Sequence, residues 1–483
     1  MIGIGIGMVR TKAMALMLGP AGFGLMGLYG VILELTQTIA GMGINSSGVR
    51  QIAAAVGSGE TARIARTALV LRRTAVVLGL LGAALLVGFA QPLSVMTFGN
   101  AEHTTAIRVL SLAVFFTAVS GGQAALIQGL RRIADLARIG ILGAFFGSLI
   151  SIALVYFLGE RGIVPALVSV AAMGILTSWW YSRKVKIQAQ PLTLEAYGQE
   201  AGGLLKLGFA FMVSGILTTG AAYVIRLILL RKFNLEAAGL YQSAWAIGGL
   251  YVGLILQSMG ADFYPRLTAI AKDNVECNRL VNEQAQISLL LAGPGVIATL
   301  TFAPLVIALF YSAKFVAAVE ILRWICLGMA LRVIAWPMGY IVLAKGVQTI
   351  FFWTEVIATV VHVGLAWLLI GQFGVAGAGM GFFGLYVWHG FFIYFIVRWL
   401  SGFRWSAANR ILGVQTMLLI GLVFCSAVFL PFWLATTIGT VAAVGSGIHA
   451  LRLLLKLVPL ERLPNFVRRL LVLFRFMPPG GRG

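Results

Sequence analysis

Charged residues are scarce in this chain of 483 residues. They make up 11% of it, whereas hydrophobic residues make up 60%. A soluble domain carries roughly a quarter charged residues, so this composition excludes an ordinary soluble protein. The mean hydropathy of +0.96 is typical of a protein that crosses a membrane many times.

Cysteine and histidine are also few, with three and four copies. Cys277, Cys326 and Cys425 are scattered and have neither disulfide nor metal-ligand spacing, so we expect no metal site and no cofactor. The pattern GxxxxGK(S/T) does not occur in the sequence, which argues against ATP hydrolysis within this chain. The N-terminus has no basic region before its apolar sequence, which predicts no cleavable signal peptide.

Apolar runs of about 20 residues, the length needed to cross a bilayer, occur fourteen times along the chain. They lie near residues 1–19, 22–46, 69–90, 105–129, 138–158, 162–182, 205–231, 237–261, 284–311, 317–344, 350–371, 375–399, 411–430 and 432–455. The last two could form one reentrant element around Pro431, but their length favours two helices.

Acidic residues are outnumbered by basic ones, 15 to 36, which gives a net charge of +21. In a soluble protein this excess would suggest nucleic acid, but here the loops account for most of it. Of the 36 basic residues, 26 fall on the side of the loop after the second run, five on the other side and five within runs. The positive-inside rule then predicts cytoplasmic N- and C-termini, and no nucleic-acid partner is expected.

An ordered series of matches links the two halves of the chain. Its members keep an offset of 212 to 217 residues. They include Gly24 and Gly239, Met42 and Met259, Arg50 and Arg266, Glu60 and Glu276, Arg63 and Arg279, and Pro92 and Pro304. Such a series indicates a duplicated membrane module, which points to a transporter.

The duplication and the runs together predict the architecture. With six runs in each repeat, both repeats enter the membrane in the same orientation, and such a pair encloses a central cavity. We expect an all-α polytopic membrane protein with two parallel six-helix repeats, twelve core helices in all, and a C-terminal helix pair, about fourteen transmembrane helices. The expected parts are an N-terminal lobe (1–184), a cytoplasmic linker (185–204), a C-terminal lobe (205–400), and the extra helix pair with a basic cytoplasmic tail (401–483).

Several segments resemble signatures of bacterial polysaccharide flippases. They are Arg-Thr-Lys at 10–12, Leu-Gly-Pro-Ala-Gly-Phe-Gly at 18–24, Gly-Met-Gly-Ile-Asn-Ser-Ser-Gly-Val-Arg at 41–50, Phe-Tyr-Pro-Arg-Leu at 263–267, and Trp-Pro-Met-Gly-Tyr-Ile-Val-Leu-Ala-Lys-Gly at 336–346. Over about residues 1–410, the chain is similar to the O-antigen translocase group of the multidrug/oligosaccharidyl-lipid/polysaccharide exporter superfamily. Family members usually begin some residues earlier, which places Met1 within the first expected helix, and the tail after about residue 460 matches no family segment.

The resemblance implies a MATE-like fold and a flippase in the bacterial inner membrane. Such a protein moves undecaprenyl-diphosphate-linked oligosaccharides from the cytoplasmic to the periplasmic leaflet by alternating access, for O-antigen or other lipopolysaccharide and exopolysaccharide synthesis. It implies membrane lipid and the lipid-linked oligosaccharide as partners, H⁺ or Na⁺ as a coupling ion, and association with polysaccharide polymerase machinery. Because the diphosphate is anionic and the tail is apolar, the task requires a cationic cavity with a lateral opening.

The five basic residues within runs are the candidates for contact with the diphosphate. A mid-membrane charge costs on the order of 2.5–3.5 kcal/mol to insert, so it usually faces a cavity. The candidates are Arg332, Arg10, Lys12, Arg226 and Arg323. Arg332 ranks first because it has no charged partner within one helical turn and because a guanidinium suits bidentate phosphate binding.

Each of the other four basic candidates has an ordinary alternative. Arg10 and Lys12 could lie at the cytoplasmic end of a shortened helix. Arg226 could belong to an interfacial snorkelling cluster with its neighbours 231 and 232. Arg323 could pair locally with Glu320.

Acidic residues and histidines within the runs are candidates for ion coupling. Glu34 and Glu355 stand alone in their runs, and His362 lies two turns after Glu355 on the same helical face, with His389 in the next run. These groups could titrate and so couple transport to a proton or cation gradient. The alternative is charge balance with an intramembrane arginine.

Two repeated pairs in the cytoplasmic loops are candidates for a gate. They are Arg50 and Arg266, and Glu60 and Glu276. Topology and loop-to-loop ion pairs are the alternative. Among the aromatic residues deep in runs, Tyr340, Trp353, Trp367 and Trp388 could stack on sugar rings, although lipid-facing or packing roles are favoured.

Two other functions compete with the flippase. A cation-coupled multidrug exporter would concentrate acids in its cavity, whereas these runs hold more basic than acidic residues. A membrane polysaccharide polymerase or glycosyltransferase would place catalytic acids or a large loop outside. The outer loops here are short and their acids lack paired spacing, so no enzymatic activity is expected.

Overall fold

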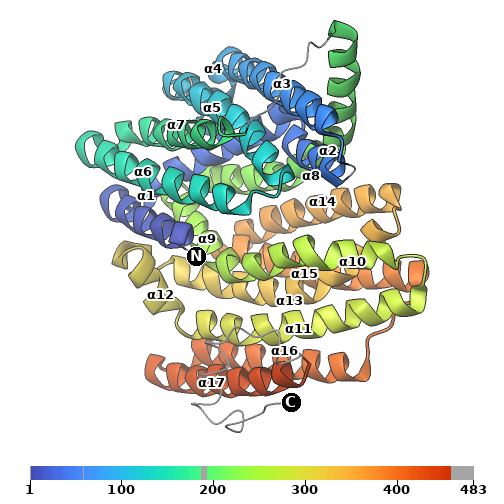
Figure 1. Ribbon diagram of the computed structural model, residues 1–483. Coiled ribbons are helices and arrows are strands. Elements are labelled where there is room, and N and C mark those ends of the chain that lie inside the picture. The colour runs from blue at the N-terminus through green and yellow to red at the C-terminus, as the bar shows by residue number, and fades with distance from the viewer. Residues whose placement is uncertain (1, 58, 186–192, 458–483) are drawn as a thin grey trace, which may run out of the picture. The chain divides into compact units, whose positions relative to one another are not determined.

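The computed structural model describes residues 2–57, 59–185 and 193–457. Most of the predicted basic tail lies outside these residues. The chain divides into two compact units. Unit 1 comprises Met1–Ser243, Ile307–Ala318 and Ile370–Val375, and unit 2 comprises Ala244–Val306, Val319–Leu369 and Ala376–Gly483. All regular elements within the described residues are helices (Figure 1).

Twelve stretches of the described residues are long and apolar enough to cross a membrane. Two of them contain a break. Ile2–Gly41 is interrupted at Gly19, and Ile133–Ser182 is interrupted by the short 3-10 helix Gly159–Gly162. If each of these two stretches is counted as two helices, the total agrees with the expected number of about fourteen transmembrane helices. The predicted all-helical, polytopic fold is confirmed.

Unit 1 is a bundle of long helices around an apolar core. It contains α1 (Ile2–Gly41), α2 (Ile44–Gly57), α3 (Thr61–Gly88), α4 (Ala90–Phe98), α5 (Thr104–Gly129), α6 (Ile133–Leu158), α7 (Ile163–Ser182), α8 (Leu194–Lys232) and the first part of α9 (Leu235–Ser258). Helix α5 packs against α3 and α7, and α6 packs against α7 (Figure 1). Buried Ile32, Leu110 and Val114 belong to the core of this bundle.

The break in α1 has a local cause. Gly19 has φ 64° and ψ −174°, a conformation that favours glycine, and Pro20 follows it and lacks a backbone N–H. The boundary predicted between runs 1–19 and 22–46 is therefore confirmed. The end predicted at residue 46 is wrong, because α1 ends at Gly41 and α2 starts at Ile44.

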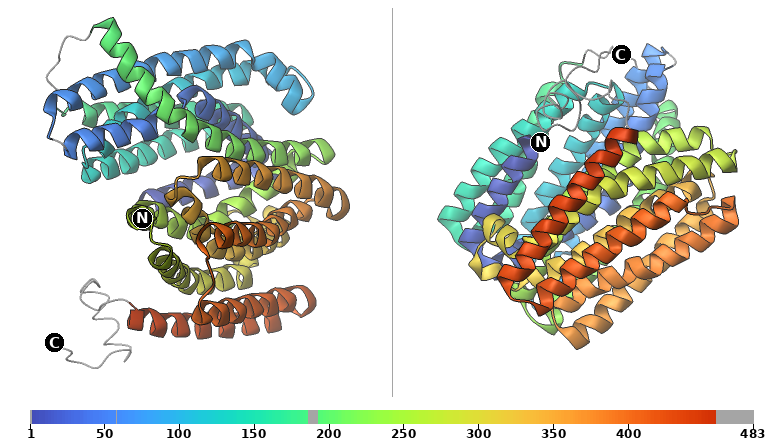
Figure 2. Two further views of the ribbon diagram at one scale, coloured as in Figure 1. Left: turned by 90° about the vertical axis from the view of Figure 1, so that its right-hand side faces the viewer. Right: turned by 90° about the horizontal axis from the view of Figure 1, so that it is seen from below.

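Unit 2 contains the rest of α9, a π-helix (Met259–Phe263), α10 (Tyr264–Ala269), α11 (Asn274–Thr301), α13 (Ala318–Ala344), α14 (Gln348–Phe373), α15 (Ala376–Ser401), α16 (Ala407–Phe429) and α17 (Phe432–Leu457). Asp273 caps α11 by accepting hydrogen bonds from the backbone N–H groups of Val275 and Glu276, at 2.9 and 3.1 Å. Helices α16 and α17 lie side by side and both pack against α11 (Figure 2).

Three boundaries refine the sequence predictions. Helices α16 and α17 are separate helices on either side of Pro431, so the two-helix interpretation is confirmed and the reentrant one is wrong. The predicted run 284–311 is divided, since α11 ends at Thr301 and α12 (Ala303–Phe310) follows. Helix α8 begins at Leu194, so residues 194–204 of the predicted linker are helical. Linker residues 186–192 lie outside the described residues, and the division into lobes stays a prediction.

Candidate functional site

Unit 2 holds a group of polar side chains on three helices. Arg332 lies on α13, Glu355 and His362 lie on α14, and His389 lies on α15. The guanidinium of Arg332 interacts electrostatically with each of the other three. These four residues are called the Arg332 cluster below. The structure thus brings together one predicted phosphate ligand and the three titratable groups predicted for coupling in the second half of the chain.

Aromatic rings are the immediate neighbours of Arg332. Its guanidinium carbon lies 4.6 Å from the ring centre of Trp336 and 5.8 Å from that of Tyr386. A cation within about 6 Å of a ring face is attracted by the ring quadrupole. The sequence has no other charged residue within one turn of Arg332, and the guanidinium lies close to the rings of Trp336 and Tyr386.

Three nitrogen atoms of the Arg332 cluster have no hydrogen-bond partner among the described residues. They are Nε of Arg332, Nε2 of His362 and Nδ1 of His389, and all three are buried. Buried polar groups are normally hydrogen-bonded, and each unsatisfied one costs about 1–3 kcal/mol. Three such atoms in one cluster indicate a place where a bound water, ion or ligand group completes the hydrogen bonds.

An apolar groove lies beside the Arg332 cluster in the same unit. Its volume is about 770 Å³, and its walls come from α13, α15 and α16. Tyr386 lines the groove and also faces Arg332, so the polar cluster and the groove share a wall. Residues such as Leu331, Phe391 and Met417 make the rest of the lining almost wholly apolar. A cation next to an open apolar groove can bind a molecule with an anionic head and an apolar tail.

Arg226 occupies a different kind of place, in unit 1. Only 4% of its surface is exposed. Its Nε donates to Oε1 of Gln242 at 2.9 Å, its Nη1 donates to the carbonyl of Ala222 at 2.8 Å, and its guanidinium lies 5.5 Å from the ring of Tyr241. Glu34 also acts on it electrostatically. A buried and hydrogen-bonded arginine does not reach an interface, so the snorkelling interpretation of Arg226 is wrong, and its contact with the diphosphate stays a prediction.

The other two basic candidates of unit 1 lie on the first half of α1. Lys12 donates a hydrogen bond to the carbonyl of Leu309. Arg10 is partly buried two residues earlier. Neither belongs to the Arg332 cluster.

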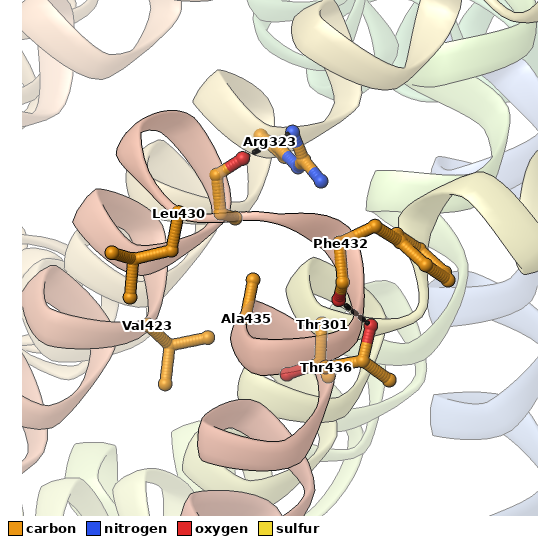
Figure 3. Close-up of a pocket in the computed structure, with 8 residues that line it drawn as sticks. Thr301, Arg323, Val423, Leu430, Phe432, Ala435 and Thr436 are labelled. Carbon is orange, nitrogen blue, oxygen red and sulfur yellow. Dashed lines mark hydrogen bonds between the residues drawn. The ribbon is translucent and has the colours of Figure 1, made fainter.

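Arg323 lines a separate small cavity in unit 2. The cavity has a volume of about 130 Å³, with Arg323 on one side and Thr301 and Thr436 on the other (Figure 3). Nη1 of Arg323 donates to the carbonyl of Ala427 at 3.1 Å. The ion pair predicted between Glu320 and Arg323 does not form within 4.0 Å, although the carboxylate still acts on the guanidinium at longer range.

Three of the four gate candidates form ion pairs with a residue three or four positions away. Arg63 lies 3.8 Å from Glu60, and Nε of Arg279 donates to Glu276 at 2.8 Å. Arg266 lies 3.5 Å from Asp262, and Arg50 is exposed on α2. These pairs are local, and the interpretation as loop-to-loop ion pairs stays a prediction. Exposed pairs of this kind contribute only about 0–1 kcal/mol each, and their gate role stays a prediction.

Comparison with known proteins identifies the family. The family described as "Polysaccharide biosynthesis protein" matches residues 13–320. The chain belongs to this family. Over 403 residues it is 25% identical to the lipid III flippases of Escherichia coli (strain K12) and Shigella flexneri, and the alignments cover 80% of this chain and 92% of each relative.

Solved structures share the fold. An inward-facing multidrug resistance MATE family transporter of the MOP superfamily matches with a TM-score of 0.70 at 16% identity, covering 82% of this chain and 95% of that chain. The lipid II flippase MurJ in an inward closed conformation matches with a TM-score of 0.68 at 13% identity, covering 94% and 97%. The expected MATE-like fold is confirmed, and these relatives are transporters and flippases rather than enzymes.

The family match ends at residue 320, so the Arg332 cluster lies beyond it. Sequence reasoning missed Trp336 and Tyr386 as neighbours of Arg332. Trp336 is four residues after Arg332 on one helix, and that spacing could have revealed it. Tyr386 is on another helix, and only the fold brings it close. Within the described ranges, no group of three or more histidine, cysteine or acidic side chains could hold a metal ion.

Proposed function

We propose that this chain is a flippase of the bacterial inner membrane that moves undecaprenyl-diphosphate-linked oligosaccharides from the cytoplasmic to the periplasmic leaflet by alternating access. The product would supply O-antigen or exopolysaccharide synthesis. The family and the lipid III flippase relatives support a lipid-linked substrate. The observation that carries the proposal is the shared wall at Tyr386, which joins a partly buried cation to an apolar groove.

Each part of the substrate has a matching part of this site. The planar guanidinium of Arg332 binds the diphosphate through charge-assisted hydrogen bonds. The groove between α13, α15 and α16 holds the first isoprene units of the lipid tail. The diphosphate competes with Glu355 for Arg332, because both are anions near one guanidinium. Substrate binding thereby frees Glu355, with His362 nearby, to take up H⁺ or Na⁺ as the coupling ion.

A multidrug exporter shares the fold but fits this site poorly. The structural similarity to the MATE transporter, at 16% sequence identity, shows that the two proteins share a fold and does not show a shared substrate. A cationic drug would meet the guanidinium of Arg332 at the end of the apolar groove, and like charges placed together disfavour binding. The site therefore favours an anionic lipid over a cationic drug.

Replacement of Arg332 tests the proposal. In a strain whose own flippase is deleted, Arg332→Ala should abolish surface polysaccharide export while the protein remains folded and inserted. Loss of a charge-assisted contact of about 1.5–3 kcal/mol weakens diphosphate binding by roughly 10- to 150-fold. Arg332→Lys should recover part of the export, because a point charge does not reproduce the planar fork. The control is Arg398→Ala, which changes an exposed arginine of the same unit.

The groove provides a second test. Gly421 lines the groove, and a Cβ atom there meets nothing within 4 Å, so Gly421→Phe fills the groove without a clash at the backbone. Export should fall in Gly421→Phe and persist in Gly445→Phe, an equally open position on α17. Normal export by Arg332→Ala and Gly421→Phe at matched expression would show that neither feature binds the substrate.

A further inference from the structure

An unbroken series of aromatic rings in unit 2 leads to Arg332. Tyr264 on α10 lies 5.6 Å from Tyr340 on α13, measured between ring centres. Nε1 of Trp336 donates to the hydroxyl of Tyr340 at 3.4 Å. Trp336 in turn lies 4.6 Å from the guanidinium of Arg332. Tyr264, Tyr340 and Trp336 are called the aromatic track below.

Tyr340, in the aromatic track, rests against a buried ring. Phe263 is 1% exposed and packs edge-on against Tyr340, with ring centres 5.7 Å apart and an angle of 76° between the rings. The three rings of the track are each partly exposed. A partly exposed ring that is held from behind, as Tyr340 is, is suited to stacking on a ligand, because little side-chain freedom remains to be lost on binding.

The spacing of the track matches a chain of sugars. Residues 332, 336 and 340 follow one another at four-residue intervals on one face of α13, so each step is about 6 Å along the helix. This step is comparable to the length of one pyranose residue in an oligosaccharide. A substrate whose diphosphate binds Arg332 would place its first sugar over Trp336 and its second over Tyr340, with Tyr264 next in the series.

The chemistry of the rings also suits sugars. A pyranose has an apolar C–H face that packs on an aromatic ring, and hydroxyl groups around its edge that need hydrogen-bond partners. Tyrosine and tryptophan combine an apolar ring with one polar atom. The bond between Trp336 and Tyr340, at 3.4 Å, is longer than the usual 2.7–3.2 Å, so both polar atoms can exchange it for sugar hydroxyls at low cost.

We infer that the aromatic track is a carbohydrate-binding site that holds the first sugar residues of a lipid-linked oligosaccharide while Arg332 holds its diphosphate. This inference rests on the proposed function and adds the residues that recognise the sugar part. It predicts that the aromatic track raises the binding affinity only of lipids that carry sugars, and that successive rings bind successive sugars.

Binding measurements with a graded set of lipids test the inference. The full chain, purified in lipid nanodiscs, is titrated with undecaprenyl diphosphate and with the same lipid carrying one, two or three N-acetylglucosamine residues. The first two sugars should each raise the affinity of the wild-type protein by about two- to twelve-fold. Trp336→Leu should lose the gain from the first sugar, and Tyr340→Leu the gain from the second. Tyr340→Leu should bind undecaprenyl diphosphate as the wild type does, and the gain from each sugar is measured for every variant relative to that variant's own affinity for undecaprenyl diphosphate.

Two further variants separate stacking from packing. Trp336→Phe keeps an aromatic face and should retain most of the gain from the first sugar. Trp433→Leu removes an exposed tryptophan on α17 that lines neither the groove nor the aromatic track, and should leave every affinity unchanged. All variants are first required to give the wild-type melting temperature.

The outcomes distinguish the inference from the proposed function. If the wild-type protein binds none of the lipids, the proposed function fails. If it binds undecaprenyl diphosphate but sugars add nothing, or if the leucine variants keep the gain, the aromatic track is wrong and the flippase proposal stands. If Trp336→Leu weakens binding of undecaprenyl diphosphate as much as that of the glycosylated lipids, Trp336 only positions Arg332, which also overturns the track.

Discussion

At the scale of single residues, Arg226 and Arg332 show what a sequence can and cannot reveal. Both stand out as charges in apolar runs, and the cost of inserting such charges marks them as important. Their partners decide their roles. Arg226 bonds to Gln242 on the next helix and is satisfied, whereas Nε of Arg332 has no partner among the described residues. Those contacts depend on how helices pack, so the sequence predicted both positions and could not separate an arginine with hydrogen-bond partners from one whose Nε lacks them.

His103 gives a residue-scale prediction about pH. It precedes α5, its Nδ1 is hydrogen-bonded to the hydroxyl of Tyr29 at 2.7 Å, and its ring stacks on Phe98 at 3.8 Å. Burial lowers the pKa of His103 below its ordinary value of 6.5, and the nearby carboxylate of Glu102 opposes this only in part. Between the lowered pKa and 6.5 the unfolded chain binds more protons. The stability from this contact is therefore present above about pH 6.5 and is lost as the pH falls.

The measurement is the melting temperature of the purified protein between pH 8 and pH 5. The wild-type melting temperature should fall on acidification by more than that of His103→Gln, because glutamine can accept the bond from Tyr29 but does not titrate in this range. Parallel profiles for the two proteins would show that His103 does not contribute to the pH dependence.

At the scale of elements, hydropathy predicted the long helices well and the short ones poorly. The long spans could be predicted because about 20 apolar residues in succession are rarely anything but a membrane helix. Helix α2 falls mostly in a segment predicted as a loop, because its 14 residues are too few for a spanning run, and the turn before it lies inside the predicted run 22–46. That turn depends on Gly43, which has φ 63°, and a Cβ atom there would lie 2.2 Å from the carbonyl oxygen of Gly208. Only the packed structure supplies this reason.

Glycines at equivalent places of the two repeats allow α1 and α9 to cross closely within unit 1. A Cβ atom on Gly24 would lie 2.0 Å from the carbonyl oxygen of Leu235, and one on Gly239 would lie 1.9 Å from that of Pro20. Small residues allow such close approach of membrane helices. Gly24→Ala should therefore push the helices apart and destabilise the protein by about 1–3 kcal/mol or more.

The matched control is Gly30→Ala on the same helix, where a Cβ atom meets nothing within 4 Å. The melting temperature in detergent should fall clearly for Gly24→Ala. For Gly30→Ala it should stay the same or rise slightly, because alanine is the better helix former. Equal melting temperatures for the two variants would contradict a tight crossing at Gly24.

At the scale of the whole molecule, the duplication read from the sequence has a counterpart in local structure. Glu60 and Arg63 form an ion pair at the start of α3, and Glu276 and Arg279 form the equivalent pair at the start of α11. The first pair belongs to unit 1 and the second to unit 2. A duplicated module predicts such a repeat, with the same ion pair at the start of the corresponding helix in each unit.

The arginines of these two ion pairs, Arg63 and Arg279, allow the predicted membrane topology to be tested. Of the 36 basic residues, 26 lie on the side of the chain that includes Arg63 and Arg279, and the positive-inside rule places that side in the cytoplasm. Both side chains are about half exposed, at 52% and 55%, so a cysteine at either position is accessible to a reagent. Arg161, which is exposed in the turn between α6 and α7, should lie on the periplasmic side.

Labelling of single cysteines in intact cells checks this topology. The background carries Cys277→Ala, Cys326→Ala and Cys425→Ala, which removes the native thiols. A membrane-impermeant maleimide should label Arg161→Cys in intact cells, and should label Arg63→Cys and Arg279→Cys only after the membrane is permeabilised. Because each repeat contains an even number of spans, positions 63 and 279 must respond alike. Labelling of both in intact cells would reverse the predicted orientation, and labelling of only one would contradict two parallel repeats.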